Sequence, residues 1–517
     1  MNPTRKWLVL AILLVPVFMT AIDISVLFLA LPSIAADLAP SATQQLWTLH
    51  IGDLLSAGLV LTAGAFSDRL GARRLLMIGM AAYGTFSLIA AYSPNPETLI
   101  FARGLIGIAA VTVGPATMVL LRHAFPTPRE FATAIAMFMA AFSGGTAFGP
   151  PFGGFLLEHF SWGAVFLANV PVTLFVAISL PLLPAVQGKG SSKVDMKSVG
   201  LSLMAIATLV YGLQEMAAQG IHWFYATMAG IGLVTGTLFV RRQLQLTDPL
   251  FDVTLFRRFG FCVSLSVLFL FLVAAASCYM QIAQYLQTVI GLSPLQAGML
   301  LAIPASIQVG ATAFAPNLLK WMRPAFAIVL GASSVVVGTL IVLMGTFLAP
   351  ETALPVVIVG ESIMALGSGP IFAISASLVM NSVPVYKTGS AAGVQEVSGS
   401  LGATTGLAIG GSLAILVYQT SIGFAMPTEV PTELAAQATQ SVGRAIAIAQ
   451  TLDPATGQSL ELAAQDAFAM ATRLVYGVAV LLILGLTGLV LYARNVMLLE
   501  AETAPEENSE LLQANTA

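Results

Sequence analysis

Charged residues are scarce along the whole of this sequence. Only 9% of its 517 residues are Asp, Glu, Lys or Arg, whereas 57% are hydrophobic. Soluble domains carry about 25% charged residues, and a mean hydropathy of +0.90 is typical of chains that lie mostly in lipid. The composition therefore excludes an ordinary soluble domain and predicts a polytopic membrane protein.

Cysteine and histidine are also rare. Cys262 and Cys278 share one apolar segment, where a helical rise of ~1.5 Å per residue would separate them by roughly 24 Å, too far for a disulfide. No group of His, Cys and carboxylates has the spacing of metal ligands, and no nucleophile has a base or a phosphate-binding loop nearby. The net charge of −3 does not suggest nucleic acid as a partner. We therefore expect no catalytic residues, no metal and no cofactor.

Long connections are few, at 185–197, 241–261 and 419–466, and apolar segments of about twenty residues recur along the chain. The first segment resembles a signal peptide, but it runs from Leu8 to Leu31 and contains Pro16 and Asp23, so we interpret it as a retained span. Barrel strands would be about ten residues long and alternating, so only helices fit. The pattern predicts fourteen transmembrane helices, at residues 8–31, 46–66, 75–93, 98–121, 131–156, 163–184, 198–217, 223–240, 262–287, 296–318, 325–348, 353–380, 388–418 and 467–493.

Lys and Arg residues are distributed unevenly between the connections. They gather on one side, whereas the opposite connections hold only Arg444 and, at a helix end, Arg473. By the positive-inside rule both termini are then cytoplasmic. The outer connection 419–466 is Ala- and Gln-rich with a helical period and predicts an extracytoplasmic helical hairpin, with a disordered loop as the alternative. Residues 494–517 form an acidic cytoplasmic tail that we expect to be disordered.

Four carboxylates lie inside apolar segments: Asp23, Asp53, Glu361 and Glu396. A charge within the membrane costs at least a few kcal/mol, so each acid needs a function or a partner. Together they make an anionic interior suited to a lipophilic cation. Since burial favours the neutral acid, such a group is able to exchange a proton for a cation. The alternative is a structural hydrogen bond for each acid. Glu215, at a segment end, is expected to reach water.

Arg103 lies several residues inside an apolar segment. Its guanidinium cannot neutralise itself, so it needs a partner or water there. The alternative is that it extends to the outer surface, which is about one helical turn away.

Aromatic and amide side chains near the acids are candidates to line a cavity. Phe28 and Tyr279 are able to stack on a cation. Gln281 and Gln284 lie along one segment at near-helical spacing. Simple packing is the alternative for all four.

Two stretches are rich in glycine. Residues 64–74, GAFSDRLGARR, combine a tight turn with a charge cluster suited to locking one conformation, although an ordinary positive loop explains them as well. Residues 144–156, GGTAFGPPFGGFL, present small residues for close helix packing and two prolines that favour a kink.

These stretches resemble motifs of the major facilitator superfamily. Arg103, followed by a glycine-rich helix, is similar to the span-four motif, which implies proton transfer or gating. The first stretch resembles the loop motif, which implies a conformational lock, at Gly64, Asp68, Arg69, Gly71, Arg73 and Arg74. The second resembles the antiporter motif GxxxGPxxGG, which implies a proton-coupled exporter and not an uptake symporter, at Gly145, Gly149, Pro150, Gly153 and Gly154.

With fourteen segments and the opening AIDISVLFLALPSI, the chain resembles the fourteen-span drug:proton antiporters of the QacA, SmvA and LfrA type. That resemblance supports Asp23 and Glu396, which fall on the acidic motifs of this branch. The branch commonly has Asp at His50 and Tyr at Gly52, and a second acid near Ser400. Here these acids are moved or absent, which makes bulky divalent cations less expected as substrates.

The resemblance implies an all-α major facilitator fold with six-helix bundles at 1–184 and 262–493 and two inserted helices at 185–261. It implies a monomeric multi-pass protein of a bacterial inner membrane that exports amphiphilic, cationic compounds, such as quaternary ammonium compounds and dyes, driven by the proton motive force. The partners are then small lipophilic substrates, protons and membrane lipids. The alternatives are an exporter of an endogenous lipid or neutral metabolite with the same fold, and then a membrane sensor or an uptake symporter.

Overall fold

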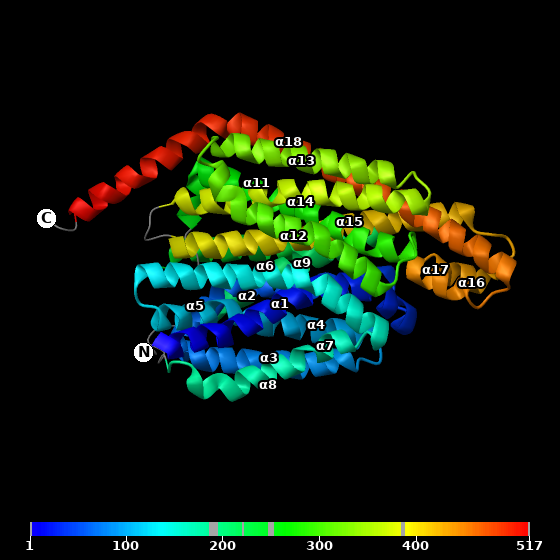
Figure 1. Ribbon diagram of the computed structural model, residues 1–517, viewed down its shortest axis with the longest axis horizontal. Helices are drawn as coiled ribbons and strands as arrows, with labels where there is room; N and C mark the ends of the chain where they lie inside the picture. Colours follow the sequence, from blue (N-terminus) through cyan, green and yellow to red (C-terminus); the bar gives the residue numbers. More distant parts are fainter. Residues whose placement is uncertain (1–2, 186–194, 220–221, 247–252, 384–387, 515–517) are drawn as a thin grey trace.

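The computed structural model describes the chain except for residues 1–2, 186–194, 220–221, 247–252, 384–387 and 515–517. The described part is helical, with no strand in it, and the expected all-α class is confirmed to that extent. Figure 1 shows long helices that run nearly parallel to one another. Their bounds are α1 Pro3–Leu38, α2 Ala42–Leu70, α3 Ala72–Ala91, α4 Pro96–Ala110, α5 Val113–Ala124, α6 Pro128–His159, α7 Ala164–Leu167, α8 Asn169–Ser179, η1 Leu180–Leu182, α9 Met196–Gln219, α10 Trp223–Gln245, η2 Val253–Arg257, α11 Phe259–Thr288, α12 Pro294–Leu318, α13 Pro324–Gly345, α14 Pro350–Asn381, α15 Thr388–Ala425, α16 Thr432–Ala438, α17 Val442–Ala449 and α18 Pro454–Ala514.

Each predicted membrane segment falls on one helix or on consecutive helices, with α4 and α5 sharing one segment and α7, α8 and η1 sharing another. Within the described residues, 11 helices are long and apolar enough to cross a membrane. The three predicted segments outside that set correspond to α2, α6 and α9. The count of fourteen spans therefore stays a prediction.

Two of the predicted spans are interrupted four residues before a proline. Proline has no N–H to donate to the carbonyl four residues before it. Pro115 stands four residues after Val111, where α4 gives way to α5, and Pro171 stands four residues after Leu167, where α7 ends. After the second break, α8 packs against both α1 and α3.

The helices form two groups that meet along a seam. In the first group α1 packs against α6, and α3 packs against α4 and α8. In the second group α13 packs against α14, and α11 packs against α15 and α18. The seam joins α6 to α12 and α2 to α15. Figure 1 shows the first group in blue and cyan on one side and the second in green to red on the other.

The inserted helices cover one edge of this seam. Helix α9 packs against α10 and also contacts both α2 and α15. It therefore bridges a helix of the first group and a helix of the second.

The two chain ends lie at one end of the bundle, and α16 and α17 lie at the other (Figure 1). These two short helices occupy the connection that is predicted to form a helical hairpin. The tail differs from its prediction, because α18 continues through Ala514 where the sequence predicts disorder from residue 494. Leu, Ala and Glu are strong helix formers, and they dominate this extension.

Candidate functional site

Asp23 of α1 and Arg103 of α4 form a buried ion pair. Arg103 Nη1 lies 2.7 Å from Asp23 Oδ2, and the residues are 4% and 6% exposed respectively. Arg103 Nε also donates to the carbonyl oxygen of Thr48 at 3.4 Å. Two buried charges are tolerated only as a well-bonded pair. The partner that the sequence requires for Arg103 is therefore supplied inside the protein, and the guanidinium does not reach the surface.

A second donor reaches Asp23 from α8. Asn169 Nδ2 donates to Asp23 Oδ1 at 3.1 Å and lies 3.4 Å from Ser87 Oγ. The buried Tyr83 of α3 lies close to the same carboxylate. Asn169 belongs to none of the motifs that the sequence shows. Its signal is a polar side chain two residues before Pro171 within an apolar segment, because the helix break there positions it.

Asp53 of α2 lies next to this pair because two glycines let α2 cross α4 at short range. A Cβ atom built on Gly107 would lie 2.2 Å from the Gly52 carbonyl oxygen, and one on Gly52 would lie 3.2 Å from the Arg103 carbonyl oxygen. Asp53 is half-buried and interacts electrostatically with Arg103 and Asp23. Gly52 thus permits Asp53 to approach Arg103.

Glu396 of α15 approaches the same region from the second group of helices. The carboxylates of Asp53 and Glu396 interact electrostatically, and the helices that carry them, α2 and α15, pack against each other. Glu396 is exposed although it lies inside a predicted span. At about 100° per residue, it points roughly 140–160° away from the exposed Ile409 and Leu416 on the same helix. Its accessible side therefore faces the interior of the bundle and not the side of the apolar outer residues.

Glu361 of α14 is placed apart from the other three acids. The Tyr476 hydroxyl of α18 donates to Glu361 Oε1 at 2.5 Å and lies 3.4 Å from the Cys278 carbonyl oxygen of α11. All three residues are buried within the second group of helices. Tyr476 carries no sequence motif that indicates this contact.

The glycines of the span-five stretch on α6 allow α1 to pack against it. Cβ atoms built on Gly145, Gly149 and Gly153 would lie 2.5 Å from the Phe18 carbonyl oxygen, 1.8 Å from Ser25 Oγ and 2.5 Å from a Val26 methyl group. Any side chain at these positions would separate α6 from the helix that carries Asp23.

The opposite face of the same stretch meets α12 across the seam. A Cβ atom on Gly154 would lie 2.4 Å from the Pro294 carbonyl oxygen, and one on Gly298 would lie 2.1 Å from the Pro150 carbonyl oxygen. Helix α6 is therefore in close contact both with α1 and, across the seam, with α12.

The stretch 64–74 forms the turn between α2 and α3. Gly71 has φ +84°, a left-handed conformation that favours glycine, and its N–H donates to the Ser67 carbonyl at 3.0 Å. Gly64, Asp68 and Arg69 lie on the last turns of α2, and Arg73 and Arg74 lie on the first turn of α3. The side chains of Asp68 and Arg69 lie outside the described residues, so the lock stays a prediction.

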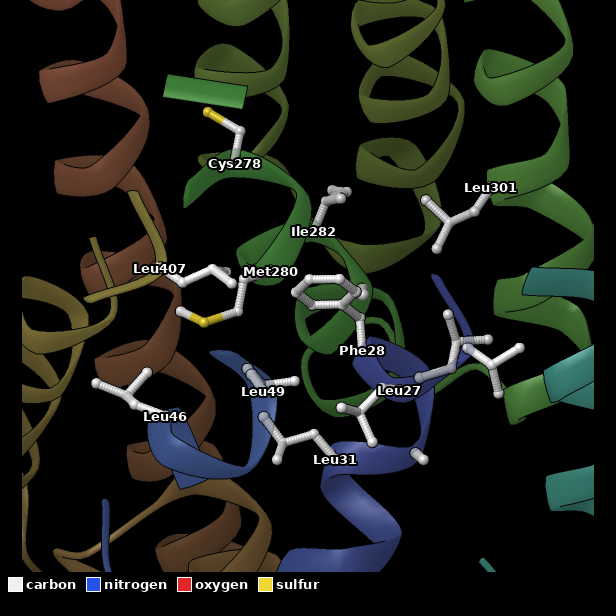
Figure 2. Packing of buried hydrophobic residues seen from close by; sticks show 14 of the residues in the cluster. Leu27, Phe28, Leu31, Leu46, Leu49, Cys278, Met280, Ile282, Leu301 and Leu407 are labelled. Atoms are coloured by element: carbon white, nitrogen blue, oxygen red, sulfur yellow. The ribbon is translucent and has the colours of Figure 1, made fainter. Parts of the chain in front are cut away.

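The cavity candidates separate into two kinds. Phe28 and Tyr279 contact each other edge to face, with ring centroids 5.0 Å apart. Figure 2 shows Phe28 surrounded by apolar side chains of α1, α2, α11 and α15. Gln281 and Gln284 instead line a small cavity of about 50 Å³ at the α17 end of the molecule.

A larger cavity of about 200 Å³ lies between α1, α6 and α8. Its walls are apolar, with Phe18 and Phe148 among them, and of its described lining residues only Asp23 and Asn169 have polar side chains. Phe148 is exposed. The cavity thus brings apolar space to the buried ion pair.

The expectation that Glu215 reaches water is wrong. Glu215 is buried, and its Oε1 accepts a hydrogen bond from Trp47 Nε1 at 3.1 Å. The reason is that α9 packs against α2, and this contact covers the carboxylate.

The sequence model of the Major Facilitator Superfamily matches residues 13–407. The chain is 36% identical over 456 residues to the multidrug efflux pump LfrA of Mycolicibacterium smegmatis, a match that covers 88% of this chain and 90% of LfrA. It is 30% identical over 458 residues to the methyl viologen resistance protein SmvA of Salmonella typhimurium, covering 88% of this chain and 91% of SmvA.

Solved structures agree at the level of the fold. A bacterial homologue of the human lysosomal transporter Spinster, in an inward-facing and unoccupied conformation, has a TM-score of 0.64 at 15% identity, covering 95% of this chain and 98% of that one. The helical architecture and the family match together confirm the expected resemblance. The chain belongs to the Major Facilitator Superfamily, as a multi-pass membrane transporter and not an enzyme, and its relatives include the multidrug efflux pump LfrA and the methyl viologen resistance protein SmvA.

Proposed function

We propose that this protein is a proton-coupled exporter of amphiphilic, cationic compounds, such as quaternary ammonium compounds and dyes. The observation that carries the proposal is the approach of Asp53 and Glu396 from the two groups of helices, next to the Asp23–Arg103 pair. A carboxylate from each side of a seam binds a cation only while the seam brings both together. This is the geometry that alternating access requires.

Arg103 connects substrate binding to the proton. It is paired with Asp23 and also interacts electrostatically with Asp53. When Asp23 takes up a proton, its attraction for the guanidinium falls, and Arg103 is drawn toward Asp53. Arg103 then competes with the bound cation for Asp53. Proton uptake therefore favours substrate release, which is the sign that an antiporter needs.

The rest of the proposal follows from this exchange. Each charge that crosses 100 mV gains about 2.3 kcal/mol, so the membrane potential contributes to export of a monovalent cation only when more than one proton enters for each cation that leaves. We place the termini in the cytoplasm and α16–α17 outside a bacterial inner membrane, on the distribution of Lys and Arg. The close packing of α6 on α1 and α12 supports rocking of the two groups as rigid units. A single chain contains all of these parts, so we propose a monomer.

The test is ethidium transport by vesicles that contain the purified protein and carry an imposed pH gradient. Asp53→Asn and Glu396→Gln are expected to lower dye transport and dye-dependent proton release at least tenfold. Asp466→Asn, an exposed acid on α18, is the matched control and should leave both unchanged. Full dye transport by both variants would refute the proposed site.

An exporter of an endogenous lipid or a neutral metabolite is the second candidate, because the walls of the 200 Å³ cavity are apolar. A panel of cationic, neutral and lipid substrates, measured in both directions across the pH gradient, separates the two. Transport of neutral compounds alone would favour the second candidate, and inward accumulation with protons would favour a symporter.

A further inference from the structure

The small cavity at the α17 end has walls from six helices. We call it the outer chamber and define it by Gln45 of α2, Gln281 and Gln284 of α11, Tyr418 of α15 and Gln440 just before α17, with apolar side chains between them. Its volume is about 50 Å³, well below the several hundred Å³ of a typical ligand pocket. It is therefore too small in this conformation to hold a whole amphiphilic substrate.

Among the described lining residues of the chamber, Gln281 is the one whose buried side-chain amide lacks hydrogen-bond partners. It is 1% exposed, and within the described part of the chain neither Oε1 nor Nε2 has a hydrogen-bond partner. A buried amide without partners costs free energy, and buried polar groups are nearly always satisfied. The neighbouring Gln287, by contrast, donates to the carbonyl oxygens of Leu29 and Ala283. Gln281 thus presents one donor group and one acceptor to any polar group that enters the chamber.

The walls of the chamber carry no charge. Among its described lining residues there is neither an acid nor a base, and the polar groups are carboxamides and hydroxyls. Arg444 of α17 contacts the roof of the chamber, where it donates to Gln440 Oε1 at 2.9 Å and to the Ala39 carbonyl oxygen at 3.3 Å. A cation in the chamber therefore finds hydrogen bonds but no counter-charge, with a guanidinium above it.

An apolar plug separates the chamber from the acids. Along α2, Leu46 lines the chamber, Leu49 follows one turn later and Asp53 one turn after that. Figure 2 shows Leu49 beside Phe28, Met280 and Leu407, from α1, α11 and α15. The order along the protein axis is thus acids, plug, chamber and the α16–α17 roof.

We propose that the outer chamber is a second, uncharged substrate subsite, which receives the hydrogen-bonding groups of an amphiphilic cation on Gln281 after the plug opens. The inference rests on the proposed function and adds to it a site for the outward half of the cycle. A cation binds tightly between acids and weakly among amides, so the chamber favours release to the outside. The charge on Arg444 opposes return.

The test compares two cationic probes that differ in hydrogen bonding. Ethidium carries amino groups, whereas tetraphenylphosphonium has no donor and no acceptor. Gln281→Leu should lower ethidium export three- to tenfold and leave tetraphenylphosphonium export within twofold. Gln281→Glu should bind both probes at least threefold more tightly and export both more slowly, because it places a counter-charge in the chamber. Gln458→Leu and Gln458→Glu, at an exposed glutamine of α18, are the matched controls.

Two results would overturn the subsite. If Gln281→Leu lowers the export of ethidium and of tetraphenylphosphonium equally, with unchanged thermal stability, Gln281 does not select for substrates that form hydrogen bonds. Unchanged transport in both Gln281 variants would show that substrate does not pass it. If the unmodified protein transports neither probe, the proposed function itself fails, and this outcome is distinct from either of the others.

Discussion

The carboxylate of Asp23 accepts from Arg103 through one oxygen and from Asn169 through the other, so three helices meet at a single side chain. Replacing Asp23 by Asn would remove the carboxylate that is hydrogen-bonded to the buried guanidinium and leave Asp53 as its remaining acidic neighbour. We expect a loss of about 3–5 kcal/mol of stability, since breaking a buried pair costs this much. The double variant Asp23→Asn with Arg103→Gln should regain part of it, as measured by thermal unfolding in detergent. A double variant less stable than Asp23→Asn alone would contradict this assignment.

Glu361 and Tyr476 give a prediction that separates structure from transport. Tyr476→Phe removes the 2.5 Å hydrogen bond and should destabilise the protein by about 1–3 kcal/mol, because the acceptor stays buried. Glu361→Gln keeps an acceptor and should leave ethidium export within twofold, since Glu361 lies apart from Asp53 and Glu396. If Glu361→Gln abolishes export as Glu396→Gln is expected to do, Glu361 belongs to the transport site instead.

At Gly107, we expect the addition of a single methyl group to lower both stability and export. A Cβ atom there would lie 2.2 Å from the backbone of Gly52, which cannot move aside as a flexible side chain would. Gly107→Ala should therefore cost about 1–3 kcal/mol and lower export by moving Asp53 away from Arg103. Gly477→Ala on α18 is the control, because no atom lies within 4 Å of the added carbon, and it should stabilise the helix by ~0.5–1 kcal/mol. Equal melting temperatures for the two variants would argue against the close crossing.

The ion pair of Asp195 and Arg242, at the base of the inserted helices, is expected to make the stability of the protein sensitive to acid. Two hydrogen bonds from Arg242, of 2.7 and 2.9 Å, hold the pKa of Asp195 well below its usual range. The unfolded chain therefore binds the proton more readily, and the contribution of the pair to stability is present above about pH 4 and is lost as the pH falls below it. When the pH is lowered from 7 to 3, the melting temperature of Asp195→Asn should fall less steeply than that of the unmodified protein. Asp466→Asn is the control, and parallel profiles for all three proteins would exclude the effect.

Much of the architecture follows from the sequence alone. In a membrane a helix satisfies its own backbone groups, so an apolar run of twenty residues predicts a helix wherever it occurs. The predicted segments all fall on helices for this reason. The glycine-rich stretches indicate the family, because small residues at a fixed spacing mark the positions where helices pack closely. Gly149 and Gly154 are such positions.

The partners of the buried acids were decided only by the tertiary structure. Asp23 and Asn169 are separated by 146 positions, and Glu361 and Tyr476 by 115. No local pattern encodes such contacts, since they depend on how whole helices cross and on where Pro171 interrupts one of them. The sequence by itself determined that this protein spans a membrane, carries acids within it and belongs to a family of transporters. Only the packing of helices decided that Asp23 is paired, that Asp53 approaches Glu396 and that Gln281 faces an uncharged chamber, because these relationships exist only between distant segments.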